Sequence, residues 1–329
     1  MNDTSNFTLT LLRWFSENGR ELPWRQTRDP YAIWLSEIIL QQTRIEQGRP
    51  YWERFMQRWP TVEALAAATE DEVLREWQGL GYYSRARNLH AAARQVTACG
   101  GFPTTIEGLR SLKGVGDYTA AAIGSIAFDL PAAVVDGNVY RVLSRHYGIS
   151  TPINTTEGKH EFAALAQSLL PEQQASAYNQ AIMDFGAIQC TPTSPHCSDC
   201  PLMECCTAFR EGKVAQLPVK QRKLKITERR LTYIYIRCKG MIAIHRRPSG
   251  DIWQGLYEPL LTDALPQGAI LLRQNVKHVL THRILYADFY LWEPDERPSL
   301  PPDYFWIPES DLDNYAVPRL IEILLEALQ

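Results

Sequence analysis

Residues 112–120 read LKGVGDYTA, and this stretch decides how the amino-terminal part of the chain folds. Gly114 and Gly116 allow a tight turn between two helical stretches, because glycine adopts backbone conformations that other residues avoid. The backbone N–H groups that open the second helix then point outward, where they can bind a DNA phosphate without reading a base. Two glycines alone would more often mark a plain turn. The helix start TAAA at residues 119–122 favours a helix-hairpin-helix motif.

The chain around this motif is helical in character from residue 7 to about residue 209. Apolar residues recur there at helical spacing, without sustained alternation. One helix start is well marked, because Asp29 can cap the helix and Pro30 suits its first position. We therefore predict an all-helical domain over residues 1–209.

The pattern changes after a polar and basic segment at residues 210–230. A closing helix is expected at residues 318–328. Runs typical of β-strands occupy residues 231–236, 241–244 and 286–292, with a turn at Lys239-Gly240. We therefore predict a linker over residues 210–230, followed by a smaller α+β domain over residues 231–329.

Composition limits the classes of protein to consider. The 329 residues, 45% of them hydrophobic, fit two ordinary globular domains. No apolar run reaches the ~18 residues that cross a bilayer, and the first residues lack the basic and apolar regions of a secretion signal. We therefore expect a cytosolic protein with no membrane partner.

Net charge gives little indication of a nucleic-acid partner, because the whole chain carries −3. Charge is locally basic between Arg210 and Arg230, with eight basic residues against two acidic ones. Such a segment can contact phosphates. A solvated linker explains the same residues equally well.

Four cysteines indicate a metal centre at the end of the helical part. They are spaced C-x6-C-x2-C-x5-C in a loop rich in proline, at Cys190, Cys197, Cys200 and Cys206. Four thiolates suffice for zinc or for a [4Fe–4S] cluster, whereas disulfides are rare in a reducing compartment. Zinc sites usually contain two short cysteine pairs, and this loop has only one. The spacing therefore favours iron–sulfur without excluding zinc.

Two carboxylates are candidates for acid–base chemistry. Glu37 lies among apolar residues, which tend to raise the pKa of a carboxyl group and suit a general acid. Asp136, in the stretch VVDGNV, ends an apolar run and opens a helix, so we expect a capping carboxylate with a low pKa. Each is also consistent with an ordinary structural role. Together, one protonated and one ionised carboxyl group suit cleavage of a glycosidic bond.

The combination resembles the MutY family of adenine DNA glycosylases, within the helix-hairpin-helix superfamily that includes endonuclease III. The resemblance covers nearly the whole chain. The motifs that carry it occur in the same order as in the family. They are LPWR at 22–25, WLSE at 34–37, LQQT at 40–43, GLGYYSRARNL at 79–89, the hairpin at 112–120, VDGN at 135–138 and the four cysteines.

The resemblance implies an enzyme of base excision repair that removes adenine paired with 8-oxoguanine or guanine in double-stranded DNA. Glu37 would protonate adenine N7, and Asp136 would stabilise the sugar cation. Tyr118 and Asn138 would hold this pair in place. The adenine must leave the base stack to be reached. The DNA-binding residues would be Trp24 and Arg25 in the adenine pocket, Gln42 and Tyr82 as wedges in the duplex, and Gly114, Val115 and Gly116 at a phosphate.

The same resemblance implies that the cysteines at 190–206 hold a [4Fe–4S] cluster that shapes a DNA-facing loop, in a monomeric protein. Tyr118 departs from the wider superfamily, where endonuclease III-like enzymes carry a lysine that attacks the sugar. We therefore expect a monofunctional glycosylase. The alternatives are a bifunctional glycosylase/lyase for oxidised pyrimidines and a non-catalytic DNA-binding or redox-sensing protein.

The carboxy-terminal part resembles the Nudix-like domain of the same family. The stretch GLYEP at residues 255–259 loosely matches a family motif. No R-E-x-x-E-E cluster, which holds magnesium in true Nudix hydrolases, follows it, so Nudix hydrolase activity is not expected of this domain. Thr281 and His282 match part of the family's Phe-Ser-His loop, which reads 8-oxoguanine. Leu280 replaces the aromatic residue, which puts stacking there in doubt. A strand end with chance polar residues is the alternative.

Overall fold

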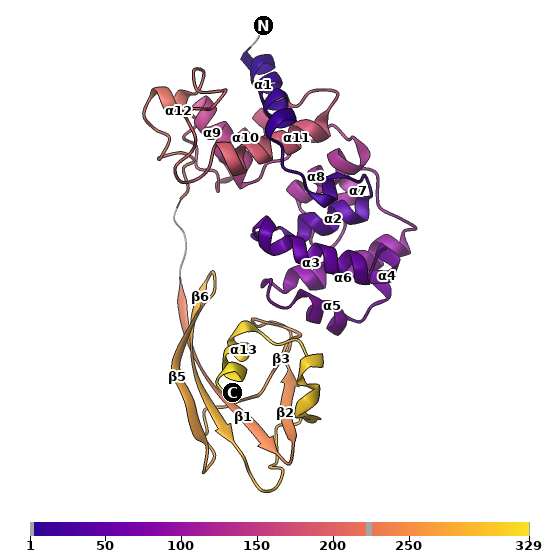
Figure 1. Cartoon of the computed structure of the whole chain (residues 1–329), viewed down its shortest axis with the longest axis vertical. Coiled ribbons are helices and arrows are strands. Elements are labelled where there is room, and N and C mark those ends of the chain that lie inside the picture. The colour runs from indigo at the N-terminus through magenta and orange to yellow at the C-terminus, as the bar shows by residue number, and fades with distance from the viewer. Residues whose placement is uncertain (1–2, 222–225, 329) are drawn as a thin grey trace. The chain divides into compact units, whose positions relative to one another are not determined.

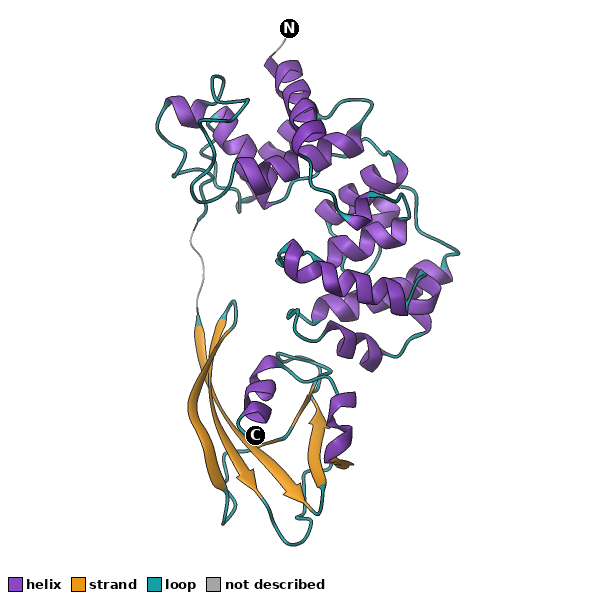
Figure 2. Ribbon diagram, viewed as in Figure 1, coloured by secondary structure: helices purple, strands orange, loops and turns teal. Residues whose placement is uncertain are grey.

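The computed structural model describes residues 3–221 and 226–328. It divides the chain into two compact units that do not follow the chain order. The first unit comprises Met1–Gly48, Thr61–Glu63 and Ala91–Arg222, and the second comprises Arg49–Pro60, Ala64–His90 and Lys223–Gln329. Part of the helical region thus belongs with the sheet. Figure 2 shows the strands confined to the carboxy-terminal part.

Helices form the described part of the first unit (Figure 1). The helices that lie wholly in this unit are, in chain order, α1 Asp3–Asn18, the 3-10 turn η1 Pro23–Arg25, α2 Pro30–Ile39, α7 Ile106–Arg110, α8 Asp117–Phe128, α9 Gly137–Tyr147, α10 Thr156–Leu169, α11 Ala175–Asp184, the π-turn η2 Phe185–Gln189 and α12 Thr207–Arg210. Helices α3 (Ile45–Arg58), α4 (Val62–Ala67) and α6 (Ser84–Ala98) contribute residues to both units, and α5 (Glu70–Trp77) belongs to the second.

The predicted start of α2 is confirmed. The Asp29 carboxylate accepts a hydrogen bond from the backbone N–H of Tyr31 at 3.0 Å, and Pro30 occupies the first helical position. Such a cap contributes about 0.5–2 kcal/mol to helix stability. Trp34 and Leu35 are fully buried, so α2 lies inside the unit and fixes the position of Glu37.

The predicted hairpin is confirmed as two helices joined by a tight turn. Helix α7 ends at Arg110, and α8 begins after Gly116. Gly114 has a φ of +78°, in the left-handed region that favours glycine. The backbone N–H of Val115 closes the turn by donating to Leu112 O at 3.1 Å.

The second unit contains a seven-stranded mixed sheet in its described residues, with the order β3-β2-β1-β6-β5 along its main path. The pairing of β1 with β6 is parallel, whereas β1 and β2 form an antiparallel hairpin at Lys239-Gly240, as predicted. The strands are β1 Thr227–Cys238, β2 Met241–Arg246, β3 Tyr257–Glu258, β4 Leu260–Leu261, β5 Ile270–Val279, β6 Arg283–Trp292 and β7 Tyr304–Pro308.

Helix α13 (Arg319–Glu326) covers one face of this sheet. Its Leu320, Ile321 and Leu324 pack with Phe289 of β6 and Tyr233 of β1 in one buried cluster. The predicted architecture, helices followed by a smaller α+β part, is therefore confirmed.

The segment predicted to be a linker differs in its details. Strand β1 begins at Thr227 rather than at Leu231, because its first residues pair with β6 from Arg283 onward. The basic residues Arg222, Lys223 and Lys225 lie outside the described residues. Within residues 3–221 and 226–328, no helix has the length and apolar content needed to cross a bilayer.

Candidate active site

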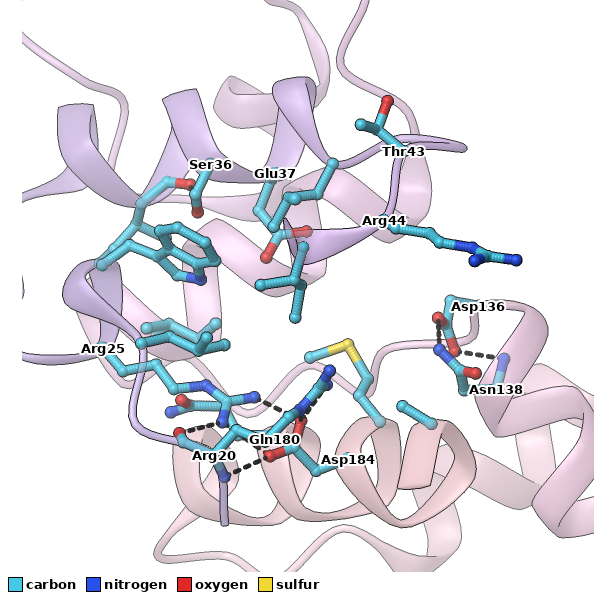
Figure 3. Close-up of a pocket in the computed structure, with 18 of the residues that line it drawn as sticks. Arg20, Arg25, Ser36, Glu37, Thr43, Arg44, Asp136, Asn138, Gln180 and Asp184 are labelled. Carbon is cyan, nitrogen blue, oxygen red and sulfur yellow. Dashed lines mark hydrogen bonds and ion pairs between the residues drawn. The ribbon is translucent and has the colours of Figure 1, made fainter. Parts of the chain in front are cut away.

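Both carboxylates singled out from the sequence line one cavity of about 420 Å³ in the first unit (Figure 3). Glu37 projects into it from α2, and Asp136 lies at the start of α9. Trp24, Arg25, Tyr118 and Asn138 also line the cavity, so it brings together the residues expected to act on or hold the base.

Glu37 is held in one orientation by Tyr118. The Tyr118 hydroxyl donates a hydrogen bond to Glu37 Oε2 at 2.7 Å and also contacts the sulfur of Met183 at 3.4 Å. Tyr118 comes from the first turn of α8, directly after the hairpin. The hairpin sequence therefore places a side chain in the cavity as well as a turn at the surface.

The predicted raised pKa of Glu37 is confirmed. Burial raises the pKa to about 7, the Tyr118 hydrogen bond opposes this rise, and the nearby charge of Asp136 adds to it. Glu37 is thus poised to hold a proton near neutral pH and to give it to a base in the cavity.

Asp136 caps helix α9. Its Oδ1 accepts hydrogen bonds from the backbone N–H groups of Asn138 and Val139, both at 2.8 Å. Its Oδ2 accepts a third bond, also at 2.8 Å, from the Asn138 side chain. Three donors therefore orient this carboxylate and favour its ionised form.

The expectation of a low pKa for Asp136 is wrong. Burial raises its pKa above the usual value, and the hydrogen bonds from Val139 and Asn138 offset only part of this effect. The sequence identified the cap without indicating how much protein surrounds it. Because Asp136 accepts three hydrogen bonds and Glu37 accepts one from Tyr118, we expect the pair to ionise first at Asp136.

A buried carboxylate that the sequence reasoning missed fixes the far wall of the cavity. Asp184 is 0% exposed and accepts hydrogen bonds from the guanidinium groups of Arg20 and Arg25. Burial would raise its pKa, but the bonds from Arg25 and Arg20 outweigh burial and hold the pKa below its usual value. An aspartate inside the apolar run AIMDFG was the available signal.

Helix α9 connects Asp136 to the cysteine loop through two buried arginines that the sequence reasoning also missed. Arg141 donates to Asn138 Oδ1 at 2.8 Å and to Cys190 O at 2.7 Å. Arg145, one turn further, donates to Thr191 O at 2.8 Å and contacts Cys190 Sγ at 3.4 Å. Their spacing of four residues on a capped helix was a weak signal for one buried face.

The four predicted metal ligands line one small cavity. Cys190, Cys197, Cys200 and Cys206 surround it, and the neighbouring Cys205 is exposed and does not line it. Across residues 3–221 and 226–328, no group of three or more His, Cys, Asp or Glu side chains lies close enough together to hold a metal ion. Burial raises the pKa of the Cys200 thiol to about 11, so metal binding must displace a proton there. The four thiols, with cationic Arg145 beside them, fit an anionic thiolate cluster.

The remaining predicted DNA-binding residues lie at the surface of their own units. In the first unit, Gly114, Gly116 and Gln42 are exposed, and a Cβ added to Gly116 would meet no atom within 4 Å. Val115 is buried and contributes only its backbone. In the second unit, Tyr82 and Thr281 are exposed, with their hydroxyl oxygens 2.7 Å apart, and His282 is exposed beside them.

The cavity chemistry suits the release of a nitrogenous base from a sugar. A protonated Glu37 can donate to a leaving group, and an ionised Asp136 can stabilise the positive charge that develops on the sugar. The burial of both carboxyl groups strengthens both interactions, because buried charges are less screened by water.

Two protein families match the chain. Residues 35–171 match the family described as "HhH-GPD superfamily base excision DNA repair protein", and residues 232–327 match the NUDIX domain. The first match contains Glu37, the hairpin and Asp136.

Individual relatives agree with these matches. An adenine DNA glycosylase of Buchnera aphidicola (subspecies Schizaphis graminum) is 34% identical over 76% of this chain and 73% of its own length. The adenine DNA glycosylase of Mus musculus is 43% identical over 66% of this chain and 45% of its own length. A solved structure of a thermostable thymine-DNA glycosylase covers 63% of this chain and 97% of its own, with a TM-score of 0.59 and 31% identity.

The raised pKa of Glu37 makes a prediction for stability. Between the pKa of an ordinary glutamate, 4.5, and about 7, the folded chain retains a proton on Glu37 that the unfolded chain has lost. Stability is therefore lost as pH rises through this window. Glu37→Gln removes the cost of ionising a buried carboxyl group. The free energy of unfolding of this variant, measured by urea denaturation and compared with that of wild type, should therefore rise by on the order of 1–3 kcal/mol from about pH 4 to about pH 8.

The matched control is Glu46→Gln, which removes an exposed carboxylate from the rim of the same cavity. A stability difference between Glu37→Gln and wild type that stays constant across this pH range would contradict the raised pKa.

Proposed function

The chain belongs to the family of adenine DNA glycosylases of base excision repair, and we propose that it releases adenine paired with 8-oxoguanine or guanine by hydrolysing the N-glycosidic bond. The observation that carries this proposal is the pair of carboxyl groups in one cavity. Glu37 is buried and has a pKa of about 7, whereas Asp136 accepts three hydrogen bonds that favour its charge.

The reaction begins with the adenine out of the base stack and inside the cavity, since no side chain can reach the bond within a duplex. Glu37 gives its proton to adenine N7 and makes the base a better leaving group. Tyr118 holds the carboxyl group of Glu37 in position through its 2.7 Å hydrogen bond.

As the bond breaks, positive charge develops on the sugar, and Asp136 stabilises it. The carboxylate cannot turn away, because two backbone N–H groups and the Asn138 amide hold both of its oxygens. Water then adds to the sugar, and the products are free adenine and a DNA strand with an abasic site.

We propose that the enzyme is monofunctional. Cleavage of the DNA strand through a Schiff base needs an amine at the sugar, and Tyr118 supplies a hydroxyl at the corresponding position. Lys113, in the hairpin turn, has an exposed side chain and does not line the cavity. A bifunctional enzyme acting on oxidised pyrimidines is therefore not favoured.

DNA is held on both units in this proposal. Gly114, Val115 and Gly116 offer backbone N–H groups to a phosphate at the start of α8. Gln42 and Tyr82 wedge into the duplex beside the mispair. Both have left-handed backbone conformations, with φ of 57° and 47°, that present their side chains at exposed turns. Thr281 and His282 read 8-oxoguanine, and the protein acts as a monomer.

The four cysteines hold a [4Fe–4S] cluster in this proposal. Bound there, the cluster supplies structural cross-linking, because base release transfers no electrons. The buried Arg141 and Arg145 of α9 hold the cysteine loop, and Asp136 caps the same helix, so α9 connects the loop to Asp136.

Adenine release is tested by single-turnover assays on duplexes containing A:8-oxoG. Glu37→Gln and Asp136→Asn should each slow release by at least about 10²-fold, the lower end of what acid–base catalysis contributes. Binding of the same duplex should stay measurable. Glu46→Gln, at the cavity rim, is the control that keeps its activity.

Wild-type activity in either catalytic variant would overturn the assignment of that residue. Efficient trapping of the wild-type enzyme on its substrate DNA by borohydride would overturn the monofunctional mechanism, since only a Schiff base is trapped this way.

The cluster is tested by metal analysis of protein purified without oxygen. Wild type should contain about four irons per chain, and Cys197→Ser should lose most of them. Cys205→Ser should retain them, because Cys205 is exposed and lies outside the cavity. Zinc in place of iron, or equal iron loss in both variants, would contradict the proposed site.

A further inference from the structure

The turn that carries Tyr82 has a strained backbone. It joins α5 to α6, and Gly79, Gly81 and Tyr82 have φ of 95°, 71° and 47°. Glycine adopts a positive φ without steric cost, whereas a tyrosine does so only where its surroundings enforce it. Tyr82 nevertheless remains 50% exposed. The turn therefore holds an aromatic ring at the surface of the second unit at a cost in free energy.

Arg85, in the first turn of α6, enforces this conformation. Its Nη2 donates hydrogen bonds to Leu80 O and Gly81 O, each at 3.3 Å, and its backbone N–H donates to Tyr82 O at 2.8 Å. The indole N–H of Trp77 adds a bond to Gly81 O at 3.0 Å. Three consecutive carbonyl groups of the turn thus accept hydrogen bonds from Arg85.

The same guanidinium group also contacts the Tyr82 ring. It lies 5.7 Å from the centroid of that ring and 5.1 Å from the centroid of the Trp77 ring. Both distances fall within the range of about 6 Å over which a cation attracts an aromatic ring. Burial lowers the pKa of Arg85 to about 10, so the group keeps its charge at neutral pH. One side chain therefore holds both the backbone and the ring of Tyr82.

Arg85 itself is poorly placed to bind DNA. It is 8% exposed, and a cation that neutralises a phosphate has to be accessible at the protein surface. The exposed group of the turn is the Tyr82 ring. Any effect of Arg85 on DNA therefore passes through Tyr82.

We propose that Arg85 is a positioning residue, which holds the Tyr82 ring in the orientation in which it enters the duplex. The proposal rests on the proposed function, because it takes Tyr82 as a wedge beside the mispair. A ring that is oriented before DNA binds loses less conformational freedom on insertion, so binding is tighter. Without Arg85, the turn relaxes and Tyr82 keeps its ring but not its position.

The test is a double-mutant cycle, which measures whether one residue acts through the other. The variants are Arg85→Met, which keeps an apolar stem and removes the cation, Tyr82→Ala, and the two changes combined. Dissociation constants are measured on a duplex with A:8-oxoG in which the adenosine is a non-hydrolysable 2′-fluoro analogue. The fluorescence of a 2-aminopurine beside the mispair reports whether the wedge opens the base stack. Thermal unfolding is measured in parallel.

The matched control is Arg237→Met. The Arg237 guanidinium lies over the ring of Tyr235 in the same unit, also at 5.7 Å, but Tyr235 is buried. The control therefore removes a cation from a tyrosine that does not reach DNA. Its dissociation constant and its fluorescence change should match those of wild type.

Tyr82→Ala should weaken binding about 5- to 150-fold, the range for loss of one aromatic stack on a base. Arg85→Met should weaken it at least about 2- to 5-fold, the equivalent of one cation–π contact, and should reduce the fluorescence change. In the Tyr82→Ala background, Arg85→Met should have no further effect. The dependence of log Kd on log salt concentration should keep its wild-type slope, because no phosphate contact is lost.

Wild-type binding in Arg85→Met, or an equal loss with and without the Tyr82 ring, would overturn the proposal. A salt slope reduced by about one would also overturn it, because Arg85 would then contact a phosphate directly. If wild type releases no adenine opposite 8-oxoguanine, the proposed function fails instead, so the two failures are distinguishable.

Should Arg85→Met not fold, the same cycle is run with Arg85→Lys. The lysine ammonium keeps the charge but lacks the fixed fork of donors that reaches two carbonyl groups. This variant should bind more weakly than wild type only when the Tyr82 ring is present. Wild-type binding, or an equal loss in both backgrounds, would again overturn the proposal.

Discussion

The burial of the Glu37 carboxyl group is the constraint on which the site depends. A carboxyl group on a fully packed helix costs free energy when ionised, so it retains its proton to about pH 7. The Tyr118 hydroxyl keeps it aimed at the cavity. Burial of this carboxyl group lowers stability at neutral pH, and in the proposed function the same burial supplies the proton for the base, so activity and stability would be linked at this one residue.

Helix α9 positions the second carboxyl group of the cavity. Asp136 occupies its N-cap, where fixed donors hold the charge, and Arg141 and Arg145 along the same helix hold the cysteine loop. Asp136 and the cysteine loop are therefore both attached to one helix. In the proposed function, a [4Fe–4S] cluster bound by these cysteines would contribute to the site by fixing the loop that α9 packs against.

Much of this could be predicted from the sequence, because local rules govern it. The Asp29-Pro30 helix start, the hairpin at Gly114 and the strand pair at Lys239-Gly240 each depend on a few neighbouring residues. What could not be predicted depends on distant ones. The pKa of Asp136 reflects surrounding protein, Asp184 meets Arg20 and Arg25 only in the fold, and helical residues 64–90 belong with the sheet unit.

The most direct test of the central claim is the pH dependence of the single-turnover rate of adenine release by wild type. If burial makes Glu37 the acid, the rate falls as pH rises through an apparent pKa of about 7. Protonation of Asp136, whose pKa is also raised by burial, reduces the rate at lower pH, so the profile has a maximum between the two. A rate that is flat from pH 5 to pH 9, or that falls with rising pH near the ordinary glutamate pKa of 4.5, would contradict it.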